Sequence, residues 1–314
     1  MPLGHWGLKA SADVGCNAAL NKSGFRRQSI QRRNRPHVDR NRIEWNAAFQ
    51  NSHTLLSLAA CGTRIHLNQF ANMSPIKAVL FDLDDTLWPI MPVIMRAETV
   101  LFDWLSAHAP AVAQQFTIES LRERRLALMA TNPRYAIDLW ALRHAALTEA
   151  FISAGEDAAK VDHAMAAFST ARNAVTLFDD VHPTLMRLHG RVALGSVSNG
   201  AADLETIGVA HYFQTSIAAH RFGCAKPDPA IFHAACGTLG VAPSEAVYVG
   251  DDPLLDVDGA QKAGLRAVWM TRSELQPQRT LPSDVQPDAI CTTFYELDQW
   301  LTERIMVASS TRAR

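Results

Sequence analysis

The sequence predicts an α/β fold, a Rossmann-like parallel sheet flanked by helices, with an α-helical unit inserted into it. Three short apolar runs have the composition of buried strands, and polar residues follow each of them: residues 79–81, 191–197 and 246–250. The long stretch between the first two runs is rich in Ala, Leu and Arg, with apolar residues three and four positions apart. This spacing is typical of helices that bury one face.

Carboxylates are concentrated directly after the first apolar run. Asp82, Asp84 and Asp85 follow residues 79–81, and Thr86 comes next. Like charges at the edge of a core disfavour one another's ionisation, and a divalent cation removes that difficulty. An aspartate beside a metal can also attack phosphorus and form an aspartyl-phosphate. The alternative for this segment alone is an acidic turn that ends a strand.

Three later segments carry other groups that phosphoryl chemistry on an aspartate needs. Ser198 and Asn199 follow the second run, where a hydroxyl and an amide can hydrogen-bond phosphate oxygens, although Ser-Asn-Gly is also an ordinary turn. Lys226 precedes two prolines and a helical pattern, so the backbone can present it to a site, although a lone lysine in a loop is usually solvated. Carboxylates suited to Mg²⁺ follow the third run at Asp251, Asp252 and Asp256.

The spacing of these segments locates the inserted unit. Asp82 and Ser198 are 116 positions apart, whereas Ser198 and Lys226 are 28 apart. A strand, a crossover and a second strand need far fewer than 116 residues, so an extra unit follows the first segment. Helices are predicted within this unit at residues 94–105, 118–130, 135–154 and 158–172. The expected divisions are an extension (1–73), the α/β core (74–88 and 176–304), the helical unit (89–175) and a tail (305–314).

One predicted helix of the inserted unit carries a candidate substrate contact. Trp140 and Arg143 lie three positions apart and would share a helix face. An aromatic ring beside a cation suits a planar, anionic substrate. The plainer expectation is that Trp140 packs between helices and that Arg143 faces solvent.

Together these segments, between about residues 75 and 272, resemble the four motifs of the haloacid dehalogenase-like hydrolase superfamily. The resemblance implies a phosphatase that uses Mg²⁺ and acts on a small phosphorylated metabolite. It implies that the helical unit is a cap that closes over the active site and excludes water. Further segments, such as residues 250–253 and 268–269, resemble a bacterial branch that hydrolyses flavin mononucleotide and the ribitylaminopyrimidine phosphate of riboflavin synthesis.

The resemblance also implies a role for each matching residue. Asp82 would be the nucleophile, and Asp84 would protonate the leaving group and then deprotonate the attacking water. The phosphoryl group would be bound by Thr86, Ser198, Asn199 and Lys226. Mg²⁺ would be bound by Asp82, the backbone carbonyl of Asp84 and Asp251, with Asp252 or Asp256 in or near its coordination shell.

Asp84 separates two chemistries within this family. Dehalogenases release halide, which needs no proton, and they typically lack an aspartate at this position. An alkoxide leaving group needs a proton, and a carboxylic acid can supply it. Asp84 therefore favours a phosphatase, and a 2-haloacid dehalogenase is the alternative.

Composition indicates one enzyme without a membrane partner. The 314 residues are 48% hydrophobic, carry a formal charge of −1 and include no run of 18 apolar residues. The five cysteines are an odd number without a CxxC pair, which favours reduced thiols and a cytoplasmic location.

The first 73 residues have a different composition, with ten Lys and Arg against three Asp and Glu. We expect disorder there, with a short helix around residues 45–60. The basic cluster could bind nucleic acid, and the second alternative is therefore a non-enzymatic nucleic-acid-binding module; it could also be an organellar transit segment. We expect instead that Met73 is the biological start and that nucleic acid is not a partner.

Overall fold

The computed structural model describes residues 74–310, with side chains as far as residue 305. The disorder, the short helix and the nucleic-acid contacts considered for residues 1–73 lie outside the described residues. The expected boundary between core and tail, at residue 305, falls within the last helix, which runs to Ser310. Within the described part of the chain, no helix is both long and apolar enough to cross a membrane.

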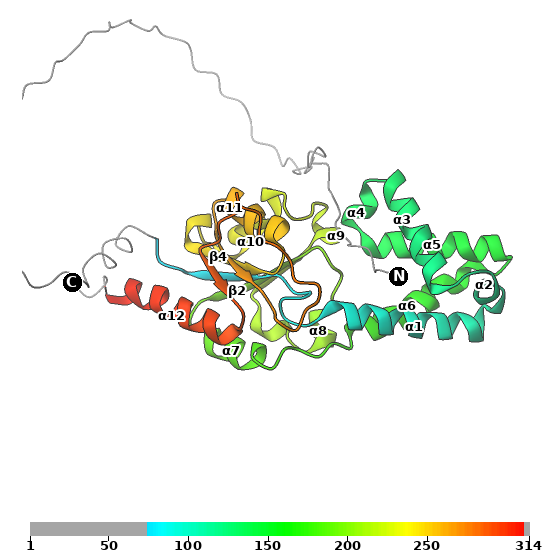
Figure 1. The fold of residues 1–314 in the computed structure, drawn as a ribbon, viewed down its shortest axis with the longest axis horizontal. Coiled ribbons are helices and arrows are strands. Elements are labelled where there is room, and N and C mark those ends of the chain that lie inside the picture. Colours follow the sequence, from blue (N-terminus) through cyan, green and yellow to red (C-terminus); the bar gives the residue numbers. More distant parts are fainter. Residues whose placement is uncertain (1–73, 311–314) are drawn as a thin grey trace, which may run out of the picture. The chain divides into compact units, whose positions relative to one another are not determined.

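A six-stranded parallel sheet forms the centre of the core, in the order β3-β2-β1-β4-β5-β6 (Figure 1). Every neighbouring pair of strands is parallel. The strands are β1 (Ala78–Phe81), β2 (Ala193–Ser198), β3 (Thr215–Ala218), β4 (Ala246–Gly250), β5 (Arg266–Met270) and β6 (Ala289–Cys291). The predicted α/β fold with a parallel sheet is confirmed.

Helices cover both faces of the sheet because alternate strand residues point to opposite sides. Val79 and Phe81 pack with α7 and α12, whereas Ala78 and Leu80 pack with α10 and α11. Figure 1 shows α7 and α12 on one side of the sheet and α10 and α11 on the other. The helices of the core are α7 (Val181–Leu188), α8 (Leu204–Ile207), α9 (Ala219–Phe222), α10 (Pro229–Leu239), α11 (Gly259–Lys262) and α12 (Phe294–Ser310). Short 3₁₀ turns η2 (Ala210–Tyr212) and η3 (Pro243–Glu245) and a π-helical turn η4 (Pro253–Asp258) complete the core.

The chain between β1 and α7 is helical, as expected. Its helices bury a separate apolar cluster that includes Leu101, Leu147 and Met165. The expected helix at 135–154 is two helices, because Asp138 ends one and caps the next by accepting from Ala141 N at 2.8 Å. The elements are α1 (Ile90–His108), α2 (Pro110–Gln115), α3 (Ile118–Thr131), α4 (Arg134–Ile137), α5 (Leu139–Ala154), η1 (Ala158–Lys160) and α6 (Val161–Asn173).

The strand order places the carboxyl ends of β1 and β4 side by side. The chain leaves β1 towards β2 on one side, and it later returns to β4 on the other side. Asp82 N donates to Val249 O at 2.9 Å, so the pairing continues to the last residues of both strands. In doubly wound sheets, ligands bind in the crevice at such a switch point.

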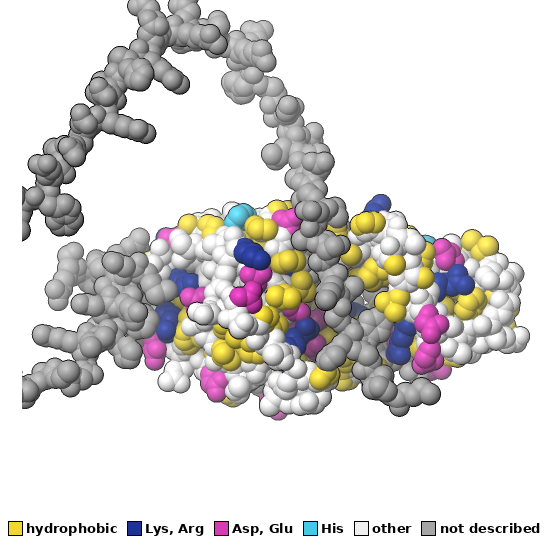
Figure 2. Space-filling view, turned by 45° about the horizontal axis from the view of Figure 1, so that its top comes forward, with side chains coloured by type: hydrophobic (Ala, Val, Ile, Leu, Met, Phe, Trp, Pro, Cys, Tyr) yellow, Lys and Arg dark blue, Asp and Glu magenta, His cyan; other side chains and the backbone are white. Residues whose placement is uncertain are grey.

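The described surface is mixed in charge. On the face drawn in Figure 2, acidic and basic side chains are interspersed among polar and apolar ones. The described cysteines Cys224, Cys236 and Cys291 are buried.

Candidate active site

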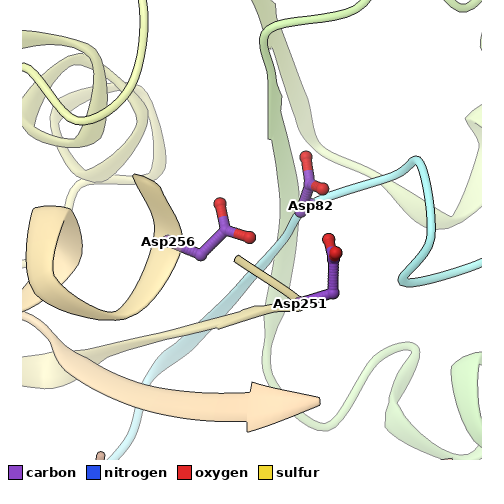
Figure 3. A group of neighbouring side chains, drawn as sticks. All are labelled: Asp82, Asp251 and Asp256. Carbon is purple, nitrogen blue, oxygen red and sulfur yellow. The ribbon is translucent and has the colours of Figure 1, made fainter. Parts of the chain in front are cut away.

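Three aspartate side chains meet at the carboxyl edge of the sheet. Asp82 follows β1, Asp251 follows β4, and Asp256 lies in the π-helical turn η4. Figure 3 shows the three side chains around one space, with the Asp256 carboxylate directed towards the other two. One oxygen from each lies within 4.8 Å of the others, and all three residues are buried. Segments that are far apart in the sequence therefore form one acidic centre.

Lys226 joins this centre from the loop before α10. Its Nζ donates to Asp82 Oδ1 at 2.6 Å, to Asp256 Oδ1 at 2.6 Å and to Tyr248 Oη at 2.9 Å. Tyr248 Oη in turn donates to Val197 O at 2.7 Å. All three hydrogens of the ammonium group thus have acceptors, as a buried cation requires.

Burial and charge set the proton affinities of this cluster. Burial raises the pKa of Asp82 to about 7, against the opposing attraction of Lys226 and with added repulsion from Asp256. Burial would lower the pKa of Lys226, but Asp256 and Asp82 outweigh it and hold that pKa well above its usual value. Burial also raises the pKa of Asp251 well above its usual value. Burial is thus the main cause of the raised pKa values of the two aspartates, and repulsion from Asp256 adds to it.

The donor set fits Mg²⁺. Three buried carboxylates face one lysine, with Arg279 paired to Asp251 from the rim, and carboxylate oxygens are the ligands that this ion prefers. Asp251 Oδ2 is buried without a hydrogen bond, although Arg279 Nε lies 2.8 Å from it as an ion-pair partner. Asp82 and Asp251 are therefore the carboxylates best placed to take a divalent cation.

Asp256 has both carboxylate oxygens engaged by the protein. Oδ1 accepts from Lys226, and Oδ2 accepts from Asp252 N at 2.9 Å. A Cβ at Gly250 would lie 2.3 Å from Asp256 Oδ2, so the close approach requires glycine at the end of β4. Asp256 thus positions Lys226 and the turn that follows β4.

Asp252 is likewise engaged. Its Oδ1 accepts from Leu254 N and Leu255 N, both at 2.9 Å, which caps η4. Its Oδ2 accepts from Arg279 Nη1 at 2.5 Å. These contacts fix the loop that carries Asp251.

The predicted phosphate-binding residues lie at neighbouring points of this edge. Asn199 holds the backbone of Lys226, since its Nδ2 donates to Lys226 O at 3.0 Å and its Oδ1 accepts from Lys226 N at 2.8 Å. Ser198 Oγ accepts from Gly200 N at 2.9 Å. Thr86 is fully buried, and its Oγ1 has no hydrogen-bond partner in the described structure. Asn199 thus links the turn that follows β2 to the loop that carries Lys226.

Trp140 and Arg143 lie in α5, and the structure reverses the plainer expectation for them. Trp140 is 44% exposed and stacks on His144, with ring centroids 5.4 Å apart. Arg143 is buried, with its guanidinium 3.7 Å from the centroid of the Phe168 ring and Nη1 3.4 Å from Glu98 Oε1. A carboxylate on α1 thus provides the counter-ion that allows this arginine to be buried.

Three contacts of the site were not predicted. Tyr248 binds Lys226, Arg279 pairs with Asp251, and Arg172 from α6 donates to the Asp84 carboxylate. Tyr248 could have been noticed as a polar group within a predicted buried strand. Arg172 and Arg279 belong to no motif, and their contacts span long sequence separations.

A doubly wound sheet with ionisable side chains at its switch point is the architecture of an α/β enzyme. Residues 76–264 match the family model of the haloacid dehalogenase-like hydrolases. The chain belongs to this family, which confirms the expected hydrolase class.

Similar proteins include phosphatases and a dehalogenase. The chain is 32% identical over 216 residues to the 5-amino-6-(5-phospho-D-ribitylamino)uracil phosphatase YigB of Escherichia coli, covering 68% of this chain and 90% of that protein. It is 33% identical to the phosphoserine phosphatase of Thermus thermophilus, covering 65% and 91%. A crystal structure of a 2-haloacid dehalogenase from Pseudomonas syringae pv. Tomato DC3000 is 38% identical, with a TM-score of 0.68 and coverage of 73% and 99%.

Proposed function

We propose that this chain is a Mg²⁺-dependent phosphomonoester hydrolase that acts on a small phosphorylated metabolite through an aspartyl-phosphate on Asp82. The observation that carries the proposal is the setting of the Asp82 carboxylate. It follows the central strand, accepts from Lys226 at 2.6 Å and lies beside Asp251 and Asp256. Positioning and charge neutralisation supply most of the catalysis in phosphoryl transfer, and this setting offers both.

In the first half-reaction, an oxygen of Asp82 bonds to phosphorus in line with the departing ester oxygen. The ester P–O bond breaks, and its electron pair goes to the departing oxygen. Lys226 holds Oδ1 of Asp82, which leaves Oδ2 to attack. Asp84 enters this step as the protonated carboxylic acid and gives that proton to the departing oxygen, so an alcohol leaves.

In the second half-reaction, water attacks phosphorus of the aspartyl-phosphate and loses a proton to the Asp84 carboxylate. The bond between phosphorus and the Asp82 oxygen breaks, which releases phosphate and restores both aspartates. Ser198 and Asn199 would hold the phosphoryl oxygens in both halves. The Lys226 cation offsets charge on the transferring group.

The residues that would hold Mg²⁺ are Asp82, Asp251 and the backbone carbonyl of Asp84. When bound, the ion supplies positive charge to the phosphoryl oxygens and offsets the carboxylates around it. Asp252 and Asp256 would support this shell through the backbone contacts described above.

We further propose that residues 89–175 act as a cap over this edge of the sheet and help to choose the substrate. Trp140 is exposed and is available to stack on a planar group. Arg143 would reach a substrate only through an opening of its contact with Glu98. The names of the relatives make a ribitylaminopyrimidine phosphate and phosphoserine the first esters to test, together with flavin mononucleotide.

A 2-haloacid dehalogenase is the second candidate, favoured by the 38% identity to the Pseudomonas syringae structure. In that reaction an oxygen of Asp82 would attack carbon, and halide would leave with the bonding electrons. Halide leaves without a proton, so Asp84 would have no role as a general acid. The phosphatase explains both aspartates, and we prefer it.

The test measures phosphate release from a panel of phosphomonoesters and halide release from a 2-chloro acid, each with Mg²⁺ or EDTA. We expect phosphate release that EDTA abolishes and that Asp82→Asn reduces by about 10³ or more. Asp103→Asn, which changes an exposed carboxylate in α1, is the matched control and should keep wild-type turnover. Halide release without phosphate release, or full turnover by the Asp82→Asn protein, would refute the proposal.

A further inference from the structure

The carboxylate of Asp84 is held by Trp88, which directly precedes the helical insertion, and by Arg172, near the end of the insertion. Arg172 Nη2 donates to its two oxygens at 2.7 and 2.8 Å, and Trp88 Nε1 donates to Oδ1 at 2.8 Å. Trp88 precedes α1, and Arg172 lies in the last turn of α6. Hydrogen bonds between a guanidinium and a carboxylate are charge-assisted and strong, so this contact fixes the carboxylate more firmly than a neutral bond would.

Arg172 is itself well fixed. Only 6% of the residue is exposed, and the next residue, Asn173, anchors the helix end to the core by accepting from Asp203 N at 3.0 Å. The Nη1 of Arg172 is buried and has no hydrogen-bond partner in the described structure. A buried donor without an acceptor is costly, so packing alone gives no reason for an arginine at this position.

Gly200 closes the remaining side of the ion pair. A Cβ at this position would lie 2.6 Å from Asp84 Oδ2, 3.3 Å from Ser198 Oγ and 3.4 Å from Arg172 Nη2. The pair therefore lies directly against the turn that carries Ser198, the proposed phosphate-binding serine. Asp84 and Arg172 thus border the place where the ester would react.

We infer that Arg172 is a positioning residue that holds the Asp84 carboxyl group where it exchanges a proton with the ester oxygen. The inference rests on the proposed function and adds to it a residue outside the family motifs. Because Arg172 belongs to the inserted helices and Asp84 follows β1, this ion pair links the end of α6 to the core.

The identity of the leaving group makes this role measurable. An alkoxide needs a proton as it departs, whereas p-nitrophenolate leaves readily without one. The value of kcat/KM includes only the steps up to departure of the alcohol, so slow hydrolysis of the aspartyl-phosphate does not affect it. A displaced acid should therefore lower kcat/KM for an alkyl ester more than for the aryl ester.

The experiment compares kcat/KM of the full-length protein for p-nitrophenyl phosphate and for the best alkyl phosphate of the panel. Arg172→Gln should lose at least about tenfold more on the alkyl ester than on the aryl ester. Arg172→Lys keeps a cation and should recover part of that difference, and it serves as the test variant if Arg172→Gln does not fold. The matched control is Arg96→Gln, because Arg96 donates to Ala174 O beside the same helix end without touching Asp84.

The outcomes separate the two proposals. Equal losses on both esters, or no loss on either, would overturn the positioning role while leaving the phosphatase proposal intact. A wild-type protein that releases phosphate from neither ester would overturn the proposed function and this inference with it. A selective loss on the alkyl ester that Arg96→Gln does not show would support the inference.

Discussion

Lys226 sets the charge balance at the centre of the site. The residue is 5% exposed, and its ammonium group lies 2.6 Å from oxygens of both Asp82 and Asp256. The two carboxylates raise its pKa against the effect of burial, so the lysine is charged at neutral pH. Without this cation, two buried carboxylates would face each other with no counter-charge.

Replacing this lysine should affect both activity and stability. We expect Lys226→Met to lower kcat/KM by about 10²–10³, because a fixed cation at the transferring group is lost. The free energy of unfolding should fall by about 3–5 kcal/mol at pH 7, because removing one partner of a buried ion pair leaves the charge of the other uncompensated. Phosphate release and urea unfolding measure the two effects.

The control for this substitution is Lys262→Met, because Lys262 forms an exposed ion pair with Asp258. Exposed pairs contribute little, so this variant should stay within about 1 kcal/mol of the wild type. A Lys226→Met protein with wild-type stability and turnover would contradict the charge balance described here.

At the residue scale, the motifs predicted side chains but not their partners. The sequence placed Asp82, Lys226 and Asp251 at strand ends and loops, and the structure brings them together. The contact between Arg172 and Asp84 joins positions 88 apart in the chain, and no local pattern reports it. The contacts of Asp256 with Lys226 and with the backbone of Asp252 were also not predicted, because they depend on the close approach of Asp256 to the backbone at Gly250.

At the scale of the elements, one carboxylate links three helices of the helical insertion. Glu98 of α1 pairs with Arg122 and Arg125 of α3 at 2.5 Å and with Arg143 of α5 at 3.4 Å. Burial would raise the pKa of Glu98, but the arginines outweigh it and lower that pKa below 4.5. A lowered pKa means that this carboxylate stabilises the fold above about pH 4.5, and that the contribution is lost as the pH falls.

We therefore expect Glu98→Gln to lower the free energy of unfolding by about 3 kcal/mol at pH 7, since it leaves Arg125 and Arg143 without their counter-ion. The difference from the wild type should shrink as the pH is lowered, because the wild-type carboxylate is then protonated as well. Urea unfolding at pH 7 and at successively lower pH measures both effects. Glu123→Gln, an exposed change in α3, should have little effect at any pH. Equal stability of wild type and Glu98→Gln at pH 7 would contradict this account.

Elements were predictable where one face or both faces were strongly apolar. The long helices and the strands β1, β2 and β4 have clear patterns, whereas β3 and β6 are short strands at the two edges of the sheet, without such a pattern. Strand β5 begins with Arg266, whose buried guanidinium donates to the carbonyls of Ser74 and Ser244. Such remote acceptors are invisible in the sequence of the strand itself.

For the whole molecule, strand order is what turns four motifs into one site. The sequence predicted a parallel sheet, but the neighbours of β1 follow only from the fold. Because β1 lies between β2 and β4, Asp82 falls between the strand ends that carry Ser198 and Asp251. The cost of this convergence is a cluster of buried negative charge, and a cation that binds it should stabilise the entire core.

Because the cluster buries negative charge, the stability of the metal-free protein should decrease as the pH rises. In the metal-free protein, burial outweighs the attraction of Lys226 and raises the pKa of Asp82 from 3.8 to about 7. A group with a raised pKa stabilises the fold fully below pH 3.8, and this stabilisation is lost as the pH rises through about 7. In EDTA, the Tm should therefore fall between pH 5 and pH 8, and Asp82→Asn should weaken that fall.

Mg²⁺ should reverse the effect, because it binds the ionised carboxylates. At a concentration of about 100 times its Kd it should raise the Tm at pH 8 by about 5–10 °C, and by less at pH 5. Thermal unfolding followed by circular dichroism, with Mg²⁺ or EDTA at both pH values, measures this without reference to activity. Asp103→Asn should show the full Mg²⁺ shift and Asp82→Asn little of it. An equal shift in both variants would mean that Mg²⁺ binds elsewhere, and the acidic centre between β1 and β4 would not be its site.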